Sequence, residues 1–194
     1  MKQLVFMFSV LWTLFSTNQA YAQRCLPGMQ GIQVTGGMVD GLHRSEGKNE
    51  LGYYFGLSMA TYSKHAHKWV FGAEFLNKYY PYGESRIPVS QFTAEGGYYL
   101  NFLSAPNKTL LFSFGGSALA GYETSNRGEK LLSDGATLRN KDGFVYGGAV
   151  TLETETYLSD RIVLLLTARE RVLWGTSTGR FHTQFGVGLK FMIH

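Results

Sequence analysis

The sequence predicts an all-β protein, an eight-stranded antiparallel up-and-down β-barrel of the outer-membrane type that follows a cleavable signal peptide. Three observations lead to this prediction. The chain begins with an apolar run that ends in Ala-Tyr-Ala. Apolar residues then alternate with polar or very small ones in segment after segment. The connections between these segments alternate between long and short.

The N-terminal residues have the three parts of an export signal. Lys2 supplies a positive charge, Leu4 to Phe15 form the apolar run, and Ala22 ends the Ala-Tyr-Ala sequence. A membrane anchor is the alternative, but this run is shorter than the roughly 20 residues that span a bilayer. We therefore expect a signal peptide at residues 1–22 and a single barrel domain at residues 23–194.

Composition restricts the class of protein. Charged residues make up 16% of the chain, which is low because about 25% is typical of soluble domains. The 18 basic and 14 acidic residues form no block of like charge, so no direct binding of nucleic acid is expected. The one cysteine, Cys25, cannot form an internal disulfide. Bulky Arg24 before it argues against acylation of that thiol as in a lipoprotein.

The first four expected strands are residues 31–39, 50–63, 68–78 and 89–103, and the first of these has the weakest pattern. Successive side chains of a strand leave opposite faces, so an alternation of this kind marks one apolar face. In the second to fourth strands that face comprises Leu51, Tyr53, Phe55, Leu57, Met59, Trp69, Phe71, Ala73, Phe75, Phe92, Ala94, Tyr98, Leu100 and Phe102.

The last four expected strands, residues 109–123, 143–158, 161–175 and 179–194, alternate more regularly. Their second face carries Gly, Ser and Thr together with carboxylates in one strand and arginines in the next. Glu170 is the exception, because it falls on the apolar face. The apolar face comprises Leu110, Phe112, Phe114, Ala118, Ala120, Tyr122, Phe144, Tyr146, Val150, Leu152, Leu158, Ile162, Leu164, Leu166, Val172, Trp174, Phe181, Phe185, Val187, Leu189, Phe191 and Ile193.

Longer connections are expected at residues 41–49, about 81–86, 124–142 and 175–179, and shorter ones at 64–67, 104–107 and 159–160. Outer-membrane barrels have long outer loops and short periplasmic turns. A soluble barrel, such as a lipocalin-like carrier, is the alternative, and its apolar face would point inward. The interior of an eight-stranded barrel is too narrow for so many large apolar side chains. The apolar face is therefore expected to contact outer-membrane lipid.

The inward face is expected to carry a charge network. Its members are Glu74, Glu95, Glu153, Glu155, Arg169, Arg171 and Lys190. Buried charges are tolerated when they are paired, so we expect an ion-paired plug in which Arg171 pairs with Glu153 or Glu155. A selective pore is the alternative, but eight strands leave little open lumen. Passage of DNA through one barrel is not expected.

No catalytic constellation, cofactor motif or metal site is recognised, so we expect a non-enzymatic protein without cofactors. A lipid-modifying barrel enzyme is the alternative. His182 is expected at the outer start of the last strand, facing the lumen as a hydrogen-bonding group. His65 and His67 lie two residues apart but without further metal ligands, so a solvated turn is expected.

The end of the chain has a pattern of its own. Gln184, Gly186, Leu189 and Phe191 form a polar-x-Gly-x-x-apolar-x-aromatic arrangement that resembles the signal read by the barrel assembly machinery. The final His194 departs from the usual aromatic residue. An ordinary amphipathic last strand is the alternative explanation.

Five strings extend across nearly the whole mature chain: "QRCLPGMQGI", "RIP", "TAEGGYY", "GYETSNRGEKLLSDGATL" and "LETETYLSDRIVLLLTARERVLWGT". In these strings the sequence resembles the TraO family, conjugative-transfer proteins of conjugative transposons of Bacteroides and relatives. The resemblance implies a role in DNA transfer between Gram-negative cells, with other transfer proteins as partners. It supplies no catalytic motif.

The longest expected connection, at about residues 124–142, is the candidate partner-binding segment, because long loops on a rigid scaffold often bind partners. It combines charges of both signs with apolar residues. A loop that only covers the barrel mouth is the alternative. The candidate contact residues are Asn126, Arg127, Glu129, Leu131, Leu132 and Asp134.

Overall fold

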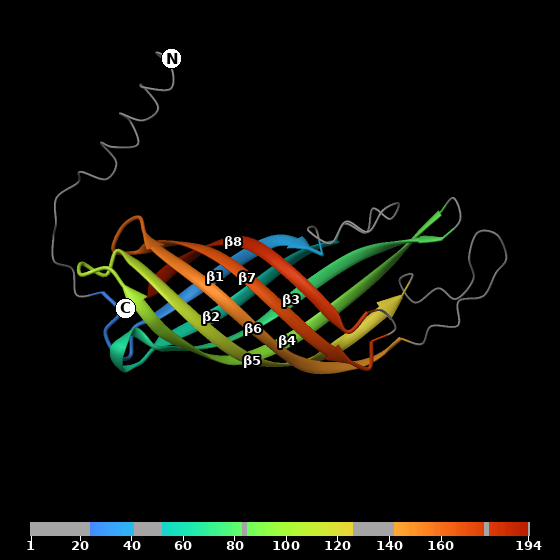
Figure 1. Cartoon of the computed structure of the whole chain (residues 1–194), viewed down its shortest axis with the longest axis horizontal. Helices are drawn as coiled ribbons and strands as arrows, with labels where there is room; N and C mark the ends of the chain where they lie inside the picture. The colour runs from blue at the N-terminus through green and yellow to red at the C-terminus, as the bar shows by residue number, and fades with distance from the viewer. Residues whose placement is uncertain (1–23, 41–51, 83–84, 126–141, 177–178, 194) are drawn as a thin grey trace, which may run out of the picture.

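The computed structural model of the chain is a closed barrel of eight antiparallel strands (Figure 1). Each strand pairs with its neighbours in sequence, and β1 closes the barrel against β8. The predicted fold class is confirmed. The expected signal peptide lies outside the described part of the chain, which comprises residues 24–40, 52–82, 85–125, 142–176 and 179–193.

The strands differ in length, and β4 is the longest. A short 3-10 turn, η1 (Lys64–Ala66), joins the second strand to the third. Within the described ranges no helix is long and apolar enough to cross a membrane. The strands are β1 (Gln30–Val39), β2 (Gly52–Tyr62), β3 (Lys68–Tyr82), β4 (Ser85–Ser104), β5 (Leu110–Ser125), β6 (Gly143–Tyr157), β7 (Ile162–Trp174) and β8 (Phe181–Ile193).

The apolar phase of each strand points out of the barrel, as the alternation predicts. Phe71 and Phe92, for example, are more than half exposed, whereas the intervening Glu74 and Thr93 are buried. Very small residues make room for large ones inside. A Cβ on Gly115 would lie 2.5 Å from Cδ1 of Tyr99, so the tyrosine ring packs directly over this glycine.

The interior is less uniformly polar than the sequence pattern predicts. Buried leucines and valines of the inward phase form apolar clusters between the charged groups. One cluster at the end where β1 begins and β8 ends, here called the inner end, includes Cys25, Tyr62, Leu111, Tyr157, Val163 and Leu165. Another, formed by Leu119, Ala149 and Leu173, lies toward the opposite or outer end. Apolar layers therefore flank the charged middle of the barrel.

The expectation of a longer connection at about residues 81–86 is wrong. Strands β3 and β4 continue through this region, pairing Pro81 with Arg86 and Tyr82 with Ser85, so that only residues 83–84 lie between them. Figure 1 shows this hairpin extending beyond the rest of the wall at the outer end. Among the described strands, β2 pairs with β3 only as far as Lys78. Pro81 lies beyond Lys78 on β3, where no described residue of β2 pairs with β3. The proline is tolerated because its missing N–H interrupts no β2–β3 hydrogen bond there.

Candidate functional site

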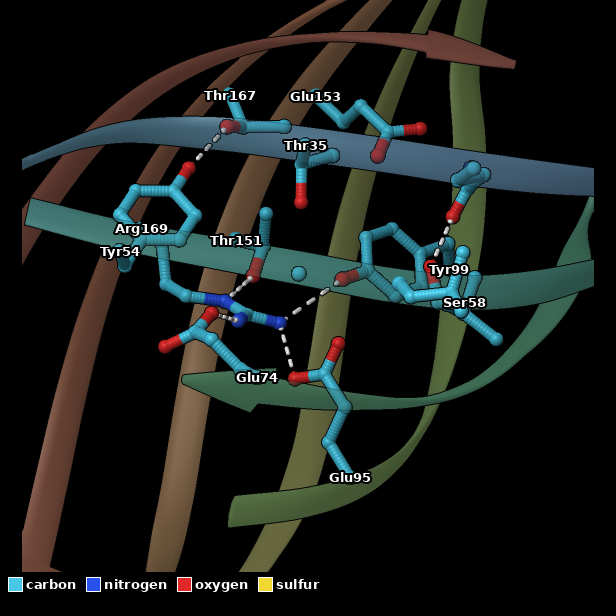
Figure 2. A pocket seen from close by; sticks show the side chains of 14 residues that line it. Thr35, Tyr54, Ser58, Glu74, Glu95, Tyr99, Thr151, Glu153, Thr167 and Arg169 are labelled. Atoms are coloured by element: carbon cyan, nitrogen blue, oxygen red, sulfur yellow. Dashed lines mark hydrogen bonds and ion pairs between the residues drawn. The ribbon is translucent and has the colours of Figure 1, made fainter. Parts of the chain in front are cut away.

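The charged interior is the candidate site, and Arg169 of β7 lies at its centre. Its guanidinium donates hydrogen bonds to Glu74 of β3 at 3.1 Å, to Glu95 of β4, and to Oγ1 of Thr151 on β6 at 3.0 Å. Figure 2 shows these side chains converging from different strands. Arginine suits this position because its planar fork of donors can serve several acceptors at once. One side chain thus ties three parts of the wall together.

Arg171 forms the second half of this central network, which comprises Glu74, Glu95, Arg169 and Arg171. It is fully buried and pairs with Glu74. The expected pairing with Glu153 or Glu155 is therefore wrong. Glu74 also accepts a 2.8 Å hydrogen bond from Nε2 of Gln184, and so links both arginines to the last strand. The stagger of the strands around the barrel, which alternation does not specify, brings β3 and β7 together across the lumen.

Glu153 and Glu155 instead belong to an inner cluster with Lys68 and Lys190. Lys68 bonds to both carboxylates, and Lys190 bonds to Glu155. The hydroxyl of Tyr62 donates to Glu155 at 2.8 Å and accepts from Nζ of Lys190 at 2.9 Å. Both lysines are completely buried. A charge this deep is tolerated when it is paired and hydrogen-bonded, as these are.

Lys68 is an interior charge that the sequence analysis did not place in the network. Its position was available from the pattern, because it shares the inward phase of Glu74 within the expected strand 68–78. Gln91 and Glu123, which bond to each other at 2.7 Å near the outer end, were missed as a pair for a different reason. Their strands follow one another, but only the register of β4 on β5 brings residues 91 and 123 opposite each other.

An outer clamp of Asp40, Lys78 and His182 ties the end of β1 to β3 and β8. The Asp40 carboxylate lies 2.8 Å from Nζ of Lys78 and 3.1 Å from Nδ1 of His182. It also accepts a 2.9 Å hydrogen bond from the backbone N–H of Thr183. Burial acts to raise the pKa of Asp40, but the hydrogen bonds and charges of His182 and Lys78 outweigh it and lower the pKa to about 2. His182 thus lies in the lumen at the outer end.

The clamp predicts acid sensitivity. In the unfolded chain the pKa of an aspartate is about 3.9, so the stabilisation from Asp40 is complete above that pH and is lost as the pH falls toward 2. Asp40→Asn is therefore expected to lower the urea midpoint of the detergent-solubilised barrel at pH 6, with a smaller difference at pH 2.5. Asp160→Asn is the control, since its pair with Arg24 is exposed and should contribute little at either pH. An equal effect of Asp40→Asn at both pH values would contradict the ionised clamp.

Residues 24–29 fold across the inner end of the barrel. Arg24 bonds to Asp160 and to Thr109, and the backbone of Gly28 donates to the carbonyl of Tyr62. Cys25 is buried, with Sγ 3.2 Å from the hydroxyl of Tyr157, and burial raises the pKa of its thiol. These contacts hold the segment against the β4–β5 and β6–β7 connections and the end of β2.

Little open space remains between these groups. A polar cavity of about 40 Å³ lies beside Arg169, lined by residues that include Gln33, Tyr54, Tyr99 and Thr167 (Figure 2). A buried water needs at least about 10–15 Å³, so the cavity is large enough to hold water. The ion-paired Glu74, Glu95 and Arg169 also line this cavity.

The residues of the expected assembly signal divide between the two faces of β8. Gln184 is buried in the central network, and Gly186 faces inward, where a Cβ would lie 1.9 Å from the hydroxyl oxygen of Tyr54. Leu189 and Phe191 point outward and are about two-fifths exposed. Gln184 and Gly186 therefore have packing roles in the folded barrel, whether or not the pattern is also read during assembly.

Two groups of candidate residues remain to be placed. The candidate contact residues of the long connection, Asn126 to Asp134, lie outside the described residues. His65 and His67 lie at the β2–β3 turn, where Nδ1 of His67 accepts a 3.0 Å hydrogen bond from the backbone of Asn101. The part of the chain that the structure describes contains no group of three or more His, Cys, Asp or Glu side chains that could hold a metal ion.

Comparison with known proteins gives a family and a fold. The model of a family described as conjugative transposon protein TraO matches residues 26–193. Neisserial surface protein A is similar in structure, with a TM-score of 0.53 and 10% identity over 84% of this chain and 96% of that one. The attachment invasion locus protein Ail of Yersinia pestis, in complex with the heparin analogue sucrose octasulfate, has a TM-score of 0.54 and 10% identity over 87% and 100%. The chain matches no curated protein sequence.

Proposed function

The chain belongs to the TraO family of conjugative transposon proteins, and we propose that it is an outer-membrane component of the conjugative apparatus that acts in assembly or contact. On this proposal it is neither the conduit for DNA nor an enzyme. Its partners are other transfer proteins, outer-membrane lipid and, during insertion, the barrel assembly machinery. A cleaved signal peptide at residues 1–22 exports it through the inner membrane.

The closed interior is the observation that carries this proposal. Arg169 and Arg171 extend from β7 to the opposite wall, where Glu74 and Glu95 hold them. Barrels that conduct through an aqueous lumen have many more strands, 16 to 18 in porins, and an eight-stranded interior is filled by its own side chains. A strand of DNA would have to displace this network of buried ion pairs. The function therefore belongs to the surfaces of the barrel.

The outward face supports a position in the outer membrane. Aromatic side chains lie near both ends of the apolar wall, as they do at the two interfaces of membrane barrels. Tyr146 and Trp174 stack near the outer end with ring centroids 6.1 Å apart, and Trp69 and Tyr98 pack near the inner end at 4.7 Å. The short connections β2–β3, β4–β5 and β6–β7 all lie at the inner end, which we therefore assign to the periplasmic side.

The outer end supplies the contact surface in this proposal. Residues 126–141 follow the outer end of β5 in the chain, and β5 pairs with β4 of the projecting β3–β4 hairpin. The hairpin carries three tyrosines, Tyr79, Tyr80 and Tyr82. Tyrosine is common where proteins meet, because its ring is large and rigid and also carries a hydroxyl. We assign the recognition of a transfer protein or a cell-surface partner to this end of the barrel.

The membrane and plug parts of the proposal predict two laboratory properties. The protein should remain in carbonate-washed outer membranes and migrate differently on SDS gels before and after heating, because a lipid-facing barrel resists detergent until heated. In planar bilayers it should give no stable conductance. A stable detergent-free monomer would contradict the membrane position, and steady porin-like currents would contradict the plug. An altered lipid A mass spectrum on deletion of the gene would favour an enzyme instead.

A further inference from the structure

Glu170 lies on the outer surface of the barrel wall. It occupies the outward phase of β7, between Ala168 and Val172. Among the outward side chains that the structure describes in the eight strands, it is the only Asp, Glu, Lys or Arg. Lipid-facing carboxylates are unfavourable, so a charge here calls for a partner.

Among the described residues, this carboxylate accepts one hydrogen bond, and it comes from a neighbouring strand. The hydroxyl of Thr183, which lies directly opposite on β8, donates to Oε2 of Glu170 at 2.6 Å. On the other side, Glu170 faces Val150 of β6, which offers no donor. An ionised carboxylate has about four acceptor positions, and lipid tails supply none of the donors to fill them.

A shallow apolar groove begins immediately beside Glu170. It has a volume of about 530 Å³ and extends over β6, β7, β8 and β1. The residues that line it include the small Gly36 and Ala168 and the larger Leu152, Leu166 and Phe185. The small residues leave the groove open between the larger side chains. Leu152, Ala168 and Phe185 lie in one row across neighbouring strands, and Glu170 lies in the next row toward the outer end. The groove and the carboxylate therefore form one continuous surface.

The depth of Glu170 disfavours a lipid headgroup as the occupant. It precedes Trp174, in the outer aromatic belt, by four residues. With a rise of about 3.3 Å per residue and a strand tilt of about 40°, it lies about 10 Å below that belt. Headgroup charges remain at the belt, and an acyl chain has no cation. A cationic side chain carried on a protein segment can reach this depth.

A second copy of this chain is also disfavoured. None of the outward side chains that the structure describes in the strands is a lysine or arginine, so these faces of a second barrel offer no cation to Glu170. We propose that the groove binds a membrane-spanning segment of another protein of the transfer apparatus, and that this segment places a lysine or arginine beside Glu170. The small residues that line the groove allow its backbone to approach closely, as small residues do between membrane helices.

The inference rests on the proposed position in the outer membrane, and photocrosslinking in donor cells with the complete apparatus tests it. p-Benzoylphenylalanine replaces Leu166, which is 47% exposed within the groove. The matched control is Phe71, which is 55% exposed on β3, the strand opposite β7 in the closed order. Each is combined with Glu170→Gln, which removes the charge but can still accept the Thr183 hydroxyl. Heat-modifiable migration shows that every variant folds.

The expected result is a protein adduct at position 166 and none at position 71. The protein crosslinked at position 166 should have a lysine or arginine in its membrane segment. Glu170→Gln should lower its yield by about thirtyfold or more, which is the loss of affinity expected when one partner of a buried charge pair is removed. A charge swap should restore the yield of the adduct. In it, Glu170→Lys is combined with replacement of the partner's lysine or arginine by glutamate.

Four results would overturn the inference: no adduct, adducts only with lipid, adducts with a second copy, or a yield insensitive to Glu170→Gln. If the wild-type barrel proves dispensable for transfer or absent from the outer membrane, the proposed function fails as well. If the barrel is in place and required for transfer, a negative crosslinking result removes only the groove.

Discussion

Replacing Glu155 with methionine is expected to destabilise the barrel more than any other single substitution in its interior. Glu155 is buried and is the carboxylate that pairs with Lys190, which is itself completely buried. Its removal leaves an ammonium group inside the barrel without its ion-pair partner, and breaking one side of a buried pair costs about 3–5 kcal/mol. Urea unfolding of the refolded barrel in detergent measures the loss.

A double substitution separates the ion pair from simple packing. Glu155→Met together with Lys190→Met removes both charges with side chains of similar length. We expect the double variant to be more stable than Glu155→Met alone, although Tyr62 then loses both of its charged hydrogen-bond partners. Asp160→Met is the matched surface control and should change the free energy of unfolding by less than about 1 kcal/mol. If the double variant lost as much unfolding free energy as the two single variants together, residues 155 and 190 would not be a coupled pair.

The largest expected effect on function follows from replacing residues 126–140 with a short Gly/Ser linker. Ser125 and Asp142 are kept, because the backbone N–H of Ser125 donates a 2.8 Å hydrogen bond to Asp142 and so joins the ends of β5 and β6. We expect the barrel to fold and reach the surface normally while the number of transconjugants falls by orders of magnitude. The removed segment contains the proposed contact residues, and the plugged lumen offers no other route for the function.

The control for the loop replacement is an insertion of the same linker at the other end of the barrel. Residues 105–108, in the β4–β5 turn, can be extended with the same linker without touching the outer surface. Normal transfer with this variant and loss with the loop variant locate the function at the outer end. Undiminished transfer after loop replacement, with heat-modifiable folding intact, would remove the loop from the mechanism.

The fold could be predicted from sequence because a barrel wall with an apolar outer face imposes a strict rule on each strand. Every second residue must be apolar, and the positions from Phe181 to Ile193 keep this rule almost without exception. The same rule assigned Glu74, Arg169 and Lys190 to the interior, where the structure places them. It also identified Glu170 as anomalous, and the structure gives that anomaly a groove and a hydrogen-bond donor.

Contacts across the lumen could not be predicted in the same way. Alternation says which residues point inward, but the stagger of the strands decides which of them meet, and so Arg171 was paired with the wrong carboxylates. The ends of the strands were also hard to predict. The Tyr- and Pro-rich sequence around Pro81 is typical of a loop, yet it continues the β3–β4 ladder beyond the rest of the barrel wall.

On our proposal this closed barrel is required for conjugation but does not conduct the DNA itself. The most direct test counts transconjugants from donors that lack the gene and carry the wild-type chain, the loop replacement or no copy, with surface abundance measured in parallel. We predict full transfer with the wild-type chain, and transfer as low with the loop replacement as with no copy. Equal transfer from all three donors would contradict the claim.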